Sequence, residues 1–305
     1  MIRELKNNSC NLAAIDIGSN AARILIKSVT DKYDDNQHTL HYKKLQFLRI
    51  PLRLGIDVFS IGKISEEREK QLIRTMKIFR QLLIIYNVED FRVCATSAFR
   101  DAKNGKRIRH YIQKNLNLDI DIITGDEEAR ILRDNNVPIA GNLLYMDVGG
   151  GSTELSLVCD EKLIKSRSFN IGTLRLLNNS VSEEDWEQMK ATVKEMIDGY
   201  DNVQIVGSGG NINKLYRLSP KRNRKKDTLT VVALERLYKH LSSLTVEERM
   251  EQYDLRPSRA DVIVPAAQLF LMVADIAKAE SISVPTVGLA DGIVNELAEK
   301  IFLTE

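Results

Sequence analysis

The sequence predicts an α/β protein of two domains, each built on a mixed β-sheet flanked by helices. Two observations predict this class. Apolar runs of strand length alternate with amphipathic helical patterns along the chain, which is typical of α/β layers. The order strand, Asp-x-Gly turn and two further strands also occurs twice, starting at residues 12–17 and 143–147. A single repeat at a domain-sized interval in 305 residues indicates two similar halves rather than a solenoid.

The first half is expected to begin with three strands and to continue with alternating helices and strands. Its clearest helix follows Ser65, a suitable N-cap, and has Leu72, Met76, Phe79 and Leu83 on one face. The expected strands are 12–17, 22–29, 39–50, 91–95 and 119–123, and a second helix is expected at about 105–115.

The second half repeats the strand order and is then richer in helix. Ser182 with Asp185, and Ser258 with Asp261, have the spacing of helix-opening caps, so each pair is expected to begin a helix. The expected strands are 143–147, 155–159, 163–168, 203–207 and 282–287, and a terminal helix follows the last of them.

The boundary between the halves is expected near residues 124–130. No linker rich in Pro, Gly or Ser marks it, so the halves should pack directly against each other. We expect residues 1–127 to form the first domain and 128–290 the second, with the terminal helix at 291–305 crossing back to the first.

Composition excludes several classes of protein. Hydrophobic content of 43% and charged content of 28% are typical of a soluble globular protein, and a net charge of +2 gives no sign of a nucleic-acid binder. The three cysteines, at 10, 94 and 159, lack metal or disulfide spacing. The N-terminus has no signal-peptide core, and the longest apolar run, 262–274, is too short to span a membrane. The protein is therefore expected in the cytoplasm.

Two Asp-x-Gly turns are the strongest functional signal. Residues 16–18 and 147–151 each follow an apolar strand, and the second turn continues with three glycines. Glycine allows the backbone to approach a ligand, successive N–H groups can hold phosphate oxygens, and a carboxylate can hold Mg²⁺. The first turn alone is explained equally well as a tight hairpin. The matching second turn favours a pair of phosphate-binding loops.

These turns belong to an ordered set of stretches that resembles one known family. Residues 15–20 (IDIGSN), 147–154 (DVGGGSTE) and 207–210 (GSGG) resemble the phosphate loops of the actin, sugar-kinase and heat-shock chaperone superfamily. More narrowly, the chain resembles the exopolyphosphatase and guanosine pentaphosphate phosphohydrolase family. Further matching stretches are 53–55 (RLG), 95–102 (ATSAFRDA), 124–130 (TGDEEAR), 259–263 (RADVI) and 288–292 (GLADG). The resemblance implies two ribonuclease H-like (actin-like) domains with mixed five-stranded sheets and an active site in the interdomain cleft.

The resemblance also implies roles for individual residues. Glu128 would be the general base that activates water, whereas the neighbouring Glu127 is explained locally by a capping box with Thr124. Asp147 and Glu154 would hold Mg²⁺, directly or through water. The residues implied to bind phosphate are Gly18, Ser19, Asn20, Arg100, Gly149, Gly150, Gly151, Ser152, Thr153, Gly209 and Gly210. The alternative roles are a solvated helix carboxylate for Glu128, a surface ion pair for Arg100 and an outward strand residue for Glu154.

The implied substrate is inorganic polyphosphate first and guanosine pentaphosphate second. Two rivals remain: a kinase or ATPase of the same superfamily, and a sensor that binds guanine alarmones or polyphosphate without hydrolysis. Three departures from the family pattern, Ala21, Asn211 and Ala266, bear on substrate choice more than on reaction class. The family also implies a homodimer, and no specific nucleic acid or membrane is expected as a partner.

Two basic clusters could guide a long polyanion. One contains Lys103, Lys106, Arg107 and Arg109, and the other is the run 221–226. A solvated charged face explains the second cluster equally well. Neither cluster is interleaved with aromatic residues, which disfavours binding of single-stranded nucleic acid.

Overall fold

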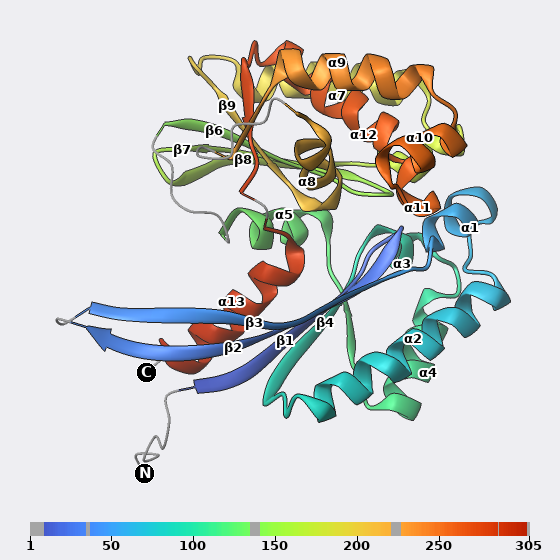
Figure 1. Cartoon of the computed structure of the whole chain (residues 1–305), viewed down its shortest axis with the longest axis vertical. Helices are drawn as coiled ribbons and strands as arrows, with labels where there is room; N and C mark the ends of the chain where they lie inside the picture. The colour runs from blue at the N-terminus through green and yellow to red at the C-terminus, as the bar shows by residue number, and fades with distance from the viewer. Residues whose placement is uncertain (1–8, 35–36, 135–140, 221–226, 286, 304–305) are drawn as a thin grey trace.

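The computed structural model describes residues 9–34, 37–134, 141–220, 227–285 and 287–303. Its elements form two α/β halves with an extended two-stranded ribbon reaching out from the first (Figure 1). Each half is built on its own mixed sheet, which confirms the predicted fold class. The basic run at 221–226 lies outside the described residues.

The first sheet has five strands in the order β3-β2-β1-β4-β5. Strands β1 (Ser9–Ile17), β2 (Ala21–Asp34) and β3 (Gln37–Pro51) form an antiparallel meander, whereas β4 (Asp90–Ala95) and β5 (Ile120–Ile122) run parallel to β1. The predicted strands are all present, and β2 and β3 are longer than predicted. Past the predicted end of β2, the chain continues with Thr30, Asp31 and Lys32, polar residues that an apolar pattern does not detect.

Both faces of this sheet are covered by helices. Alternate β1 residues face opposite sides, so Ala13 and Ile15 join one apolar cluster and Leu12 and Ala14 another. Helices α2 (Glu66–Ile85) and α4 (Gly105–Leu116) supply the first cluster, and α13 (Leu289–Phe302) supplies much of the second (Figure 1). Shorter helices are α1 (Leu54–Ile61), α3 (Ser97–Asp101) and α5 (Gly125–Asp134).

The second sheet has six strands rather than the expected five, in the order β10-β11-β9-β6-β7-β8. The additional strand, β10 (Thr228–Thr230), pairs antiparallel with β11 at the sheet edge and has three residues, too few to show a period. The other strands are β6 (Asn142–Val148), β7 (Thr153–Cys159), β8 (Lys162–Phe169), β9 (Gln204–Ser208) and β11 (Ser281–Ser283).

A single large apolar cluster joins this sheet to its helices. Met189, Val193 and Met196 of α7 (Glu183–Ile197) are buried in it, and Ser182 with Asp185 forms the predicted capping box. The remaining helices are α6 (Thr173–Leu177), α8 (Gly209–Leu218), α9 (Val231–Ser243), α10 (Val246–Tyr253), α11 (Pro257–Ala260) and α12 (Ile263–Ile276).

The predicted helix start at Ser258 is wrong. Pro257 already occupies the first turn of α11, with Arg256 as its N-cap, so Ser258 lies inside that short helix. The long apolar helix α12 begins separately after Val262. A serine with an acid three residues later matched the capping pattern, but the preceding proline fixed the helix start earlier.

Direct contacts join the two halves. The Asn20 side chain donates to the Ser258 carbonyl at 3.0 Å, and Arg53 forms an ion pair with Asp261. Farther along the junction, the Asn178 side chain donates to the Ile56 carbonyl at 3.1 Å. Helix α13 then leads the end of the chain back to the first sheet. Division of the chain at residues 127 and 128, with 291–305 assigned to the first domain, stays a prediction.

We expect Ile293→Ala in α13 to lower the free energy of unfolding by about 2–5 kcal/mol, because it leaves a cavity under the first sheet. Ile293 is fully buried, whereas Ile301 of the same helix is 42% exposed. Ile301→Ala is therefore the matched control and should change stability by only about 0.5 kcal/mol or less. Denaturant unfolding of both variants measures the difference, and equal losses would show that α13 does not hold the sheet.

Candidate active site

The candidate site lies at the ends of strands from both halves. The strands end there with carboxylates and backbone groups that face the same cleft. Asp16 lies at the end of β1 and Asp147 at the end of β6, one in each half. Strand β9, parallel to β6, ends at Ser208 and leads directly into the glycines at 209–210. Ligands of open α/β sheets commonly bind outside such carboxyl ends.

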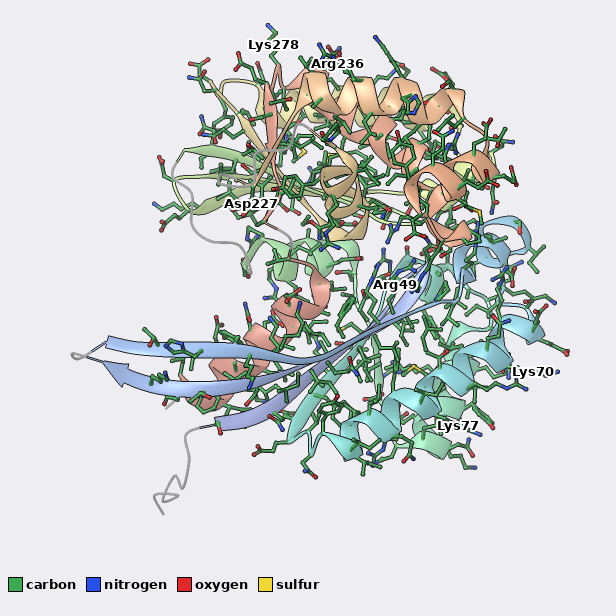
Figure 2. All side chains as sticks on the ribbon, in the orientation of Figure 1. Arg49, Lys70, Lys77, Asp227, Arg236 and Lys278 are labelled. Atoms are coloured by element: carbon green, nitrogen blue, oxygen red, sulfur yellow. The ribbon has the colours of Figure 1, made fainter. Side chains whose placement is uncertain are left out.

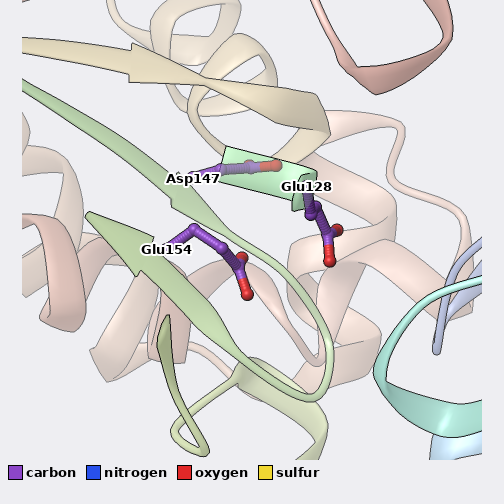
Figure 3. A group of neighbouring side chains, drawn as sticks. All are labelled: Glu128, Asp147 and Glu154. Atoms are coloured by element: carbon purple, nitrogen blue, oxygen red, sulfur yellow. The ribbon is translucent and has the colours of Figure 1, made fainter. Parts of the chain in front are cut away.

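Three carboxylates meet at this point: Glu128, Asp147 and Glu154 (Figure 3). One oxygen from each lies within 4.8 Å of the others. Asp147 of β6 is directly opposite Glu154 in the antiparallel pairing with β7, so the register itself brings these two side chains together. Glu128 reaches the same place from the first turn of α5.

Burial and mutual repulsion make the charged forms of these groups costly. Burial and the neighbouring carboxylates of Glu154 and Asp147 raise the pKa of Glu128 well above its ordinary value, and Arg100 opposes the shift. Burial and Glu154 raise the pKa of Asp147 to about 8. Burial also raises the pKa of Glu154, opposed by hydrogen bonds from Ser152 and Ser168 and by the charge of Arg100.

The cluster fits a divalent cation with oxygen ligands. Glu128 Oε2 and Glu154 Oε2 are buried and accept no hydrogen bond from the described residues. The nearest cationic group, Arg100 Nη1, lies 3.6 Å from Glu128 Oε2 and donates instead to the Ile123 carbonyl at 2.7 Å. Carboxylate oxygens left without donors are ligands that Mg²⁺ prefers, and its charge would remove their repulsion.

Glycine is required where the β9 turn passes the cluster. Gly209 has φ +85°, and a Cβ added there would collide with Asp147 Oδ1. The second glycine turn is equally tight, because Gly149 N–H donates to the Ser152 carbonyl at 2.9 Å. The backbone at Gly209 therefore lies close against Asp147, where a side chain would not fit.

A cleft of about 400 Å³ connects these groups between the two halves. The predicted residues that line it are Gly18, Ser19, Asn20, Glu128, Asp147, Gly149, Gly150, Ser152, Gly209 and Gly210. Ser19 shares a 2.8 Å hydrogen bond with Ser97, and Asn20 Oδ1 is buried without a partner among the described residues. Ten of the fourteen residues predicted for the site thus line the cleft.

Four predicted residues are not among those that line the cleft. Glu154 lies behind it within the carboxylate cluster, and Arg100 reaches Glu128 from the side. The Thr153 side chain is fully buried and donates to the Ile171 carbonyl at 2.6 Å. The Gly151 carbonyl accepts from Arg175 Nε at 2.7 Å. In this structure the polar groups of the last two residues hold the loop.

Four arginines that were not predicted line the cleft, the fourth being Arg217. The other three, Arg23, Arg49 and Arg259, repel one another (Figure 2 shows Arg49 between the halves). Burial and their mutual repulsion lower the pKa of Arg49 to about 10 and of Arg259 to about 9. Arg49 Nε and Nη2 are buried without a partner among the described residues, and Arg23 pairs with Asp16. Concentrated positive charge of this kind suits a ligand with several anionic groups.

A signal for two of these arginines was present in the sequence. Asp16, Arg23 and Arg49 are direct neighbours across β1, β2 and β3, so they stand in one row on one face of the sheet. Charged residues inside otherwise apolar strands mark such a row. Arg259 belongs to one of the matching stretches of the sequence, but nothing local distinguished it from a helix surface residue.

Comparison with known proteins identifies the family. The model of the Ppx/GppA phosphatase family matches residues 35–301. The chain belongs to this family. Membership places it among phosphohydrolases that act on phosphoric anhydrides and agrees with the carboxylates and glycine loops described above.

Two curated relatives match much of the chain. A protein from Fusobacterium nucleatum named bifunctional 3-dehydroquinate synthase/phosphatase is 29% identical over 87% of this chain and 43% of its own length. A protein from Aeromonas salmonicida named guanosine-5'-triphosphate,3'-diphosphate pyrophosphatase is 24% identical over 94% of this chain and 59% of its own. The chain thus spans about half the length of these relatives.

A solved structure named as an exopolyphosphatase from Cytophaga hutchinsonii matches end to end. It is 25% identical, covers 97% of this chain and 100% of its own, and superposes with a TM-score of 0.81. Other Ppx/GppA structures support the two-domain, actin-like fold, as predicted. None of the helices in the described part of the chain is long and apolar enough to cross a membrane.

We expect removal of the Asp147 charge to change how stability depends on pH in the metal-free protein. The pKa of Asp147 is about 8 when folded and near 3.8 otherwise, so the folded state holds a proton that the unfolded state releases. The free energy of unfolding then falls as pH rises from about 4 to about 8. Asp147→Asn has no carboxyl proton to release on unfolding, so its free energy of unfolding should not fall in this way. The variant should therefore become more stable than the wild type toward pH 8.

Thermal unfolding in chelator at pH 5 and pH 8 tests this expectation, with Asp201→Asn, at an exposed position, as the control. Added Mg²⁺ should stabilise the wild type and the control at pH 8 but not Asp147→Asn. Parallel pH profiles for all three proteins would contradict it.

Gly209→Ala should disable the site with little harm to the fold. Both Gly209 and Gly199 have positive φ, +85° and +80°, so alanine at either position costs about 1–2 kcal/mol of stability. A Cβ at Gly199 has open space, whereas one at Gly209 displaces Asp147. Calorimetric titration with Mg²⁺ should show weakened binding only in Gly209→Ala, and equal affinities in the two variants would refute the steric argument.

Proposed function

We propose that the protein hydrolyses the terminal phosphoric anhydride of a polyphosphate chain, with Glu128 as general base. The observation that carries the proposal is the meeting of three carboxylates, two of them buried, with glycine loops from both halves at one cleft. Family membership and the exopolyphosphatase named among the solved structures support the same reaction.

The side chains suit this reaction in complementary ways. Glu128 would accept a proton from water as the water oxygen attacks the terminal phosphorus and the bond to the bridging oxygen breaks. Its raised pKa favours this role, because a stronger base accepts the proton more readily, and Arg100 at 3.6 Å favours the charged form that must act. Arg100 would then also stabilise charge on the phosphate oxygens.

The loops would position the substrate. Gly150, Gly210 and Ser152 line the cleft, and the backbone N–H groups of the two glycines would hold phosphate oxygens. The N–H groups of Gly18 and Gly149 already donate to the carbonyls of Ala21 and Ser152 and would keep their turns closed. Thr153 and Gly151, whose polar groups are already bonded, would fix the loop from behind. Positioning of this kind supplies most of the catalysis in phosphoryl transfer.

Asp147 and Glu154 are the residues that would hold Mg²⁺, beside the general base Glu128. When bound, the ion supplies positive charge that offsets the anionic phosphate and the clustered carboxylates. Further positive charge in the cleft would accommodate other phosphate groups of the substrate. It comes from Arg23, Arg49 and Arg259, and from Lys44, Lys214 and Arg217.

Guanosine pentaphosphate is the second candidate substrate. The name of the Aeromonas salmonicida relative supports it, and so does one feature of the cleft. Phe47 lines the cleft, is 48% exposed and lies near the apolar Leu25. An inorganic polyphosphate chain has no apolar group that could contact Phe47, whereas a guanine base could stack on the Phe47 ring.

Glu128→Gln should reduce phosphate release by at least about a hundredfold, because general-base catalysis is commonly worth that much, and should leave substrate binding in place. Glu127→Gln is the matched control, since Glu127 lies one residue away and pairs with Arg92 instead. Release from long polyphosphate, tripolyphosphate and guanosine pentaphosphate with Mg²⁺ is measured for all three proteins, together with calorimetric binding.

The control should retain activity on the substrate that the wild type prefers, and the ranking of rates identifies that substrate. Binding of all three ligands without release by the wild type would instead indicate a non-hydrolytic sensor. Equal activity of Glu128→Gln and the wild type would exclude Glu128 as the base.

A further inference from the structure

A second, open groove of about 850 Å³ lies on the first domain beside the candidate active site. We call it the basic groove. It runs along α3 and the first turns of α4. Its lining residues are Phe99, Arg100, Asp101, Ala102, Lys103, Lys106, Arg109, His110, Gln113 and Ile122.

The charge of the basic groove is strongly one-sided. Four of its lining residues are Arg or Lys, and the single acid, Asp101, already pairs with Arg175 of the second half. Lys103 and Lys106 are exposed and form no ion pair among the described residues. Two rings line the groove: Phe99 is buried, and the exposed imidazole of His110 is the one surface among the lining residues on which a base could stack. The cations outnumber this one ring, so the groove is suited to a polyanion without bases.

The cations share one face because of helical spacing. Lys106 and Arg109 are three residues apart on α4, and Lys103 precedes the helix by two residues. The stem of Lys103 packs against Gly62, to whose carbonyl its own N–H donates at 3.0 Å. Arg109 is held by Asp119 at 3.1 Å. The row is therefore positioned by its surroundings rather than left as free lysines.

The basic groove also reaches the catalytic centre. Arg100 lines the groove, and its Nη1 lies 3.6 Å from Glu128 Oε2, while Glu128 lines the cleft on the other side. Arg100 and Glu128 thus lie where the basic groove and the cleft meet. A phosphate contacted by Arg100 at the reaction site would have neighbouring cations in the direction of Lys103 and Lys106.

We propose that the basic groove binds phosphate units of a polyphosphate chain that lie beyond the unit at Glu128. This inference rests on the proposed function and adds a second site to it. The groove provides a path along the first domain for a chain longer than the cleft, and three cations spaced along it would interact with successive anionic units. It should affect long chains and leave short ones unaffected.

Kinetics with substrates of two lengths test the proposal. The variant Lys103→Ala/Lys106→Ala should raise KM for long-chain polyphosphate about threefold to tenfold, the effect of losing two exposed charge contacts. KM for tripolyphosphate and kcat for both substrates should stay unchanged. The rise for the long chain should disappear at high salt, because exposed charges are screened there.

Two control variants separate charge in the groove from charge in general. Lys103→Arg/Lys106→Arg keeps the charge and should behave like the wild type. Lys70→Ala/Lys77→Ala removes two exposed lysines of α2 that point to solvent away from the groove, and it should leave both KM values unchanged (Figure 2).

An equal rise in KM for both substrates, or no rise for the long chain, would overturn the proposal and leave the proposed hydrolysis untouched. Orthophosphate is the other anion that such a groove could take. Weaker inhibition by added orthophosphate in the double alanine variant, with KM for the long chain unchanged, would assign the groove to the product instead.

Failure of the proposed function has a different signature. It appears as absence of phosphate release in the wild type itself. Binding of labelled long-chain polyphosphate to wild type and variants, measured by fluorescence anisotropy, then still tests the groove, and equal affinities would reject it.

Discussion

The repulsion among three carboxylates, two of them buried and Asp147 partly exposed, is the constraint on which the rest of the site depends. Glu128, Asp147 and Glu154 come from a helix and two strands, and no described donor satisfies two of their oxygens. Burial of this kind is costly unless protons or a cation compensate it. The β6–β7 register, the α5 start and the positive-φ glycine at 209 all maintain this arrangement. The fold thus holds together negative charges that lack a partner, and a bound cation would relieve their repulsion.

Positive charge is arranged around this centre in two separate places. The row formed by Arg23 and Arg49 stands on strands of the first sheet, with Arg259 facing it from the second half, whereas Lys103 and Lys106 line the basic groove on the other side of Arg100. An anionic chain placed at the carboxylates therefore encounters cations in both directions. Selection between substrates of different shape then depends on which of the two sets of cations the phosphate groups of each substrate can reach.

Local sequence signals located most of the helices and strands, because caps and apolar periodicity depend on short-range interactions. The family resemblance supplied ten of the residues that line the cleft. Ser65 caps its helix as predicted, and apolar runs located every strand except the three-residue β10. Ser258 failed because the preceding proline set the helix start. The carboxylate separations could not be obtained, since they depend on strand register and on the position of α5. Charge within apolar strands did mark Arg23 and Arg49, but their pairing with Asp16 in one row follows only from the register.

Helix α13 has a consequence for the way the chain is made. It covers the face of the first sheet that carries Leu12 and Ala14, although almost the whole second half precedes it in the chain. During synthesis from the N-terminus, the second half can therefore complete its apolar cluster while the first sheet still has one bare face. The half whose strands emerge first from the ribosome is finished last, and chaperones that recognise exposed apolar strands have the whole of that interval in which to bind it.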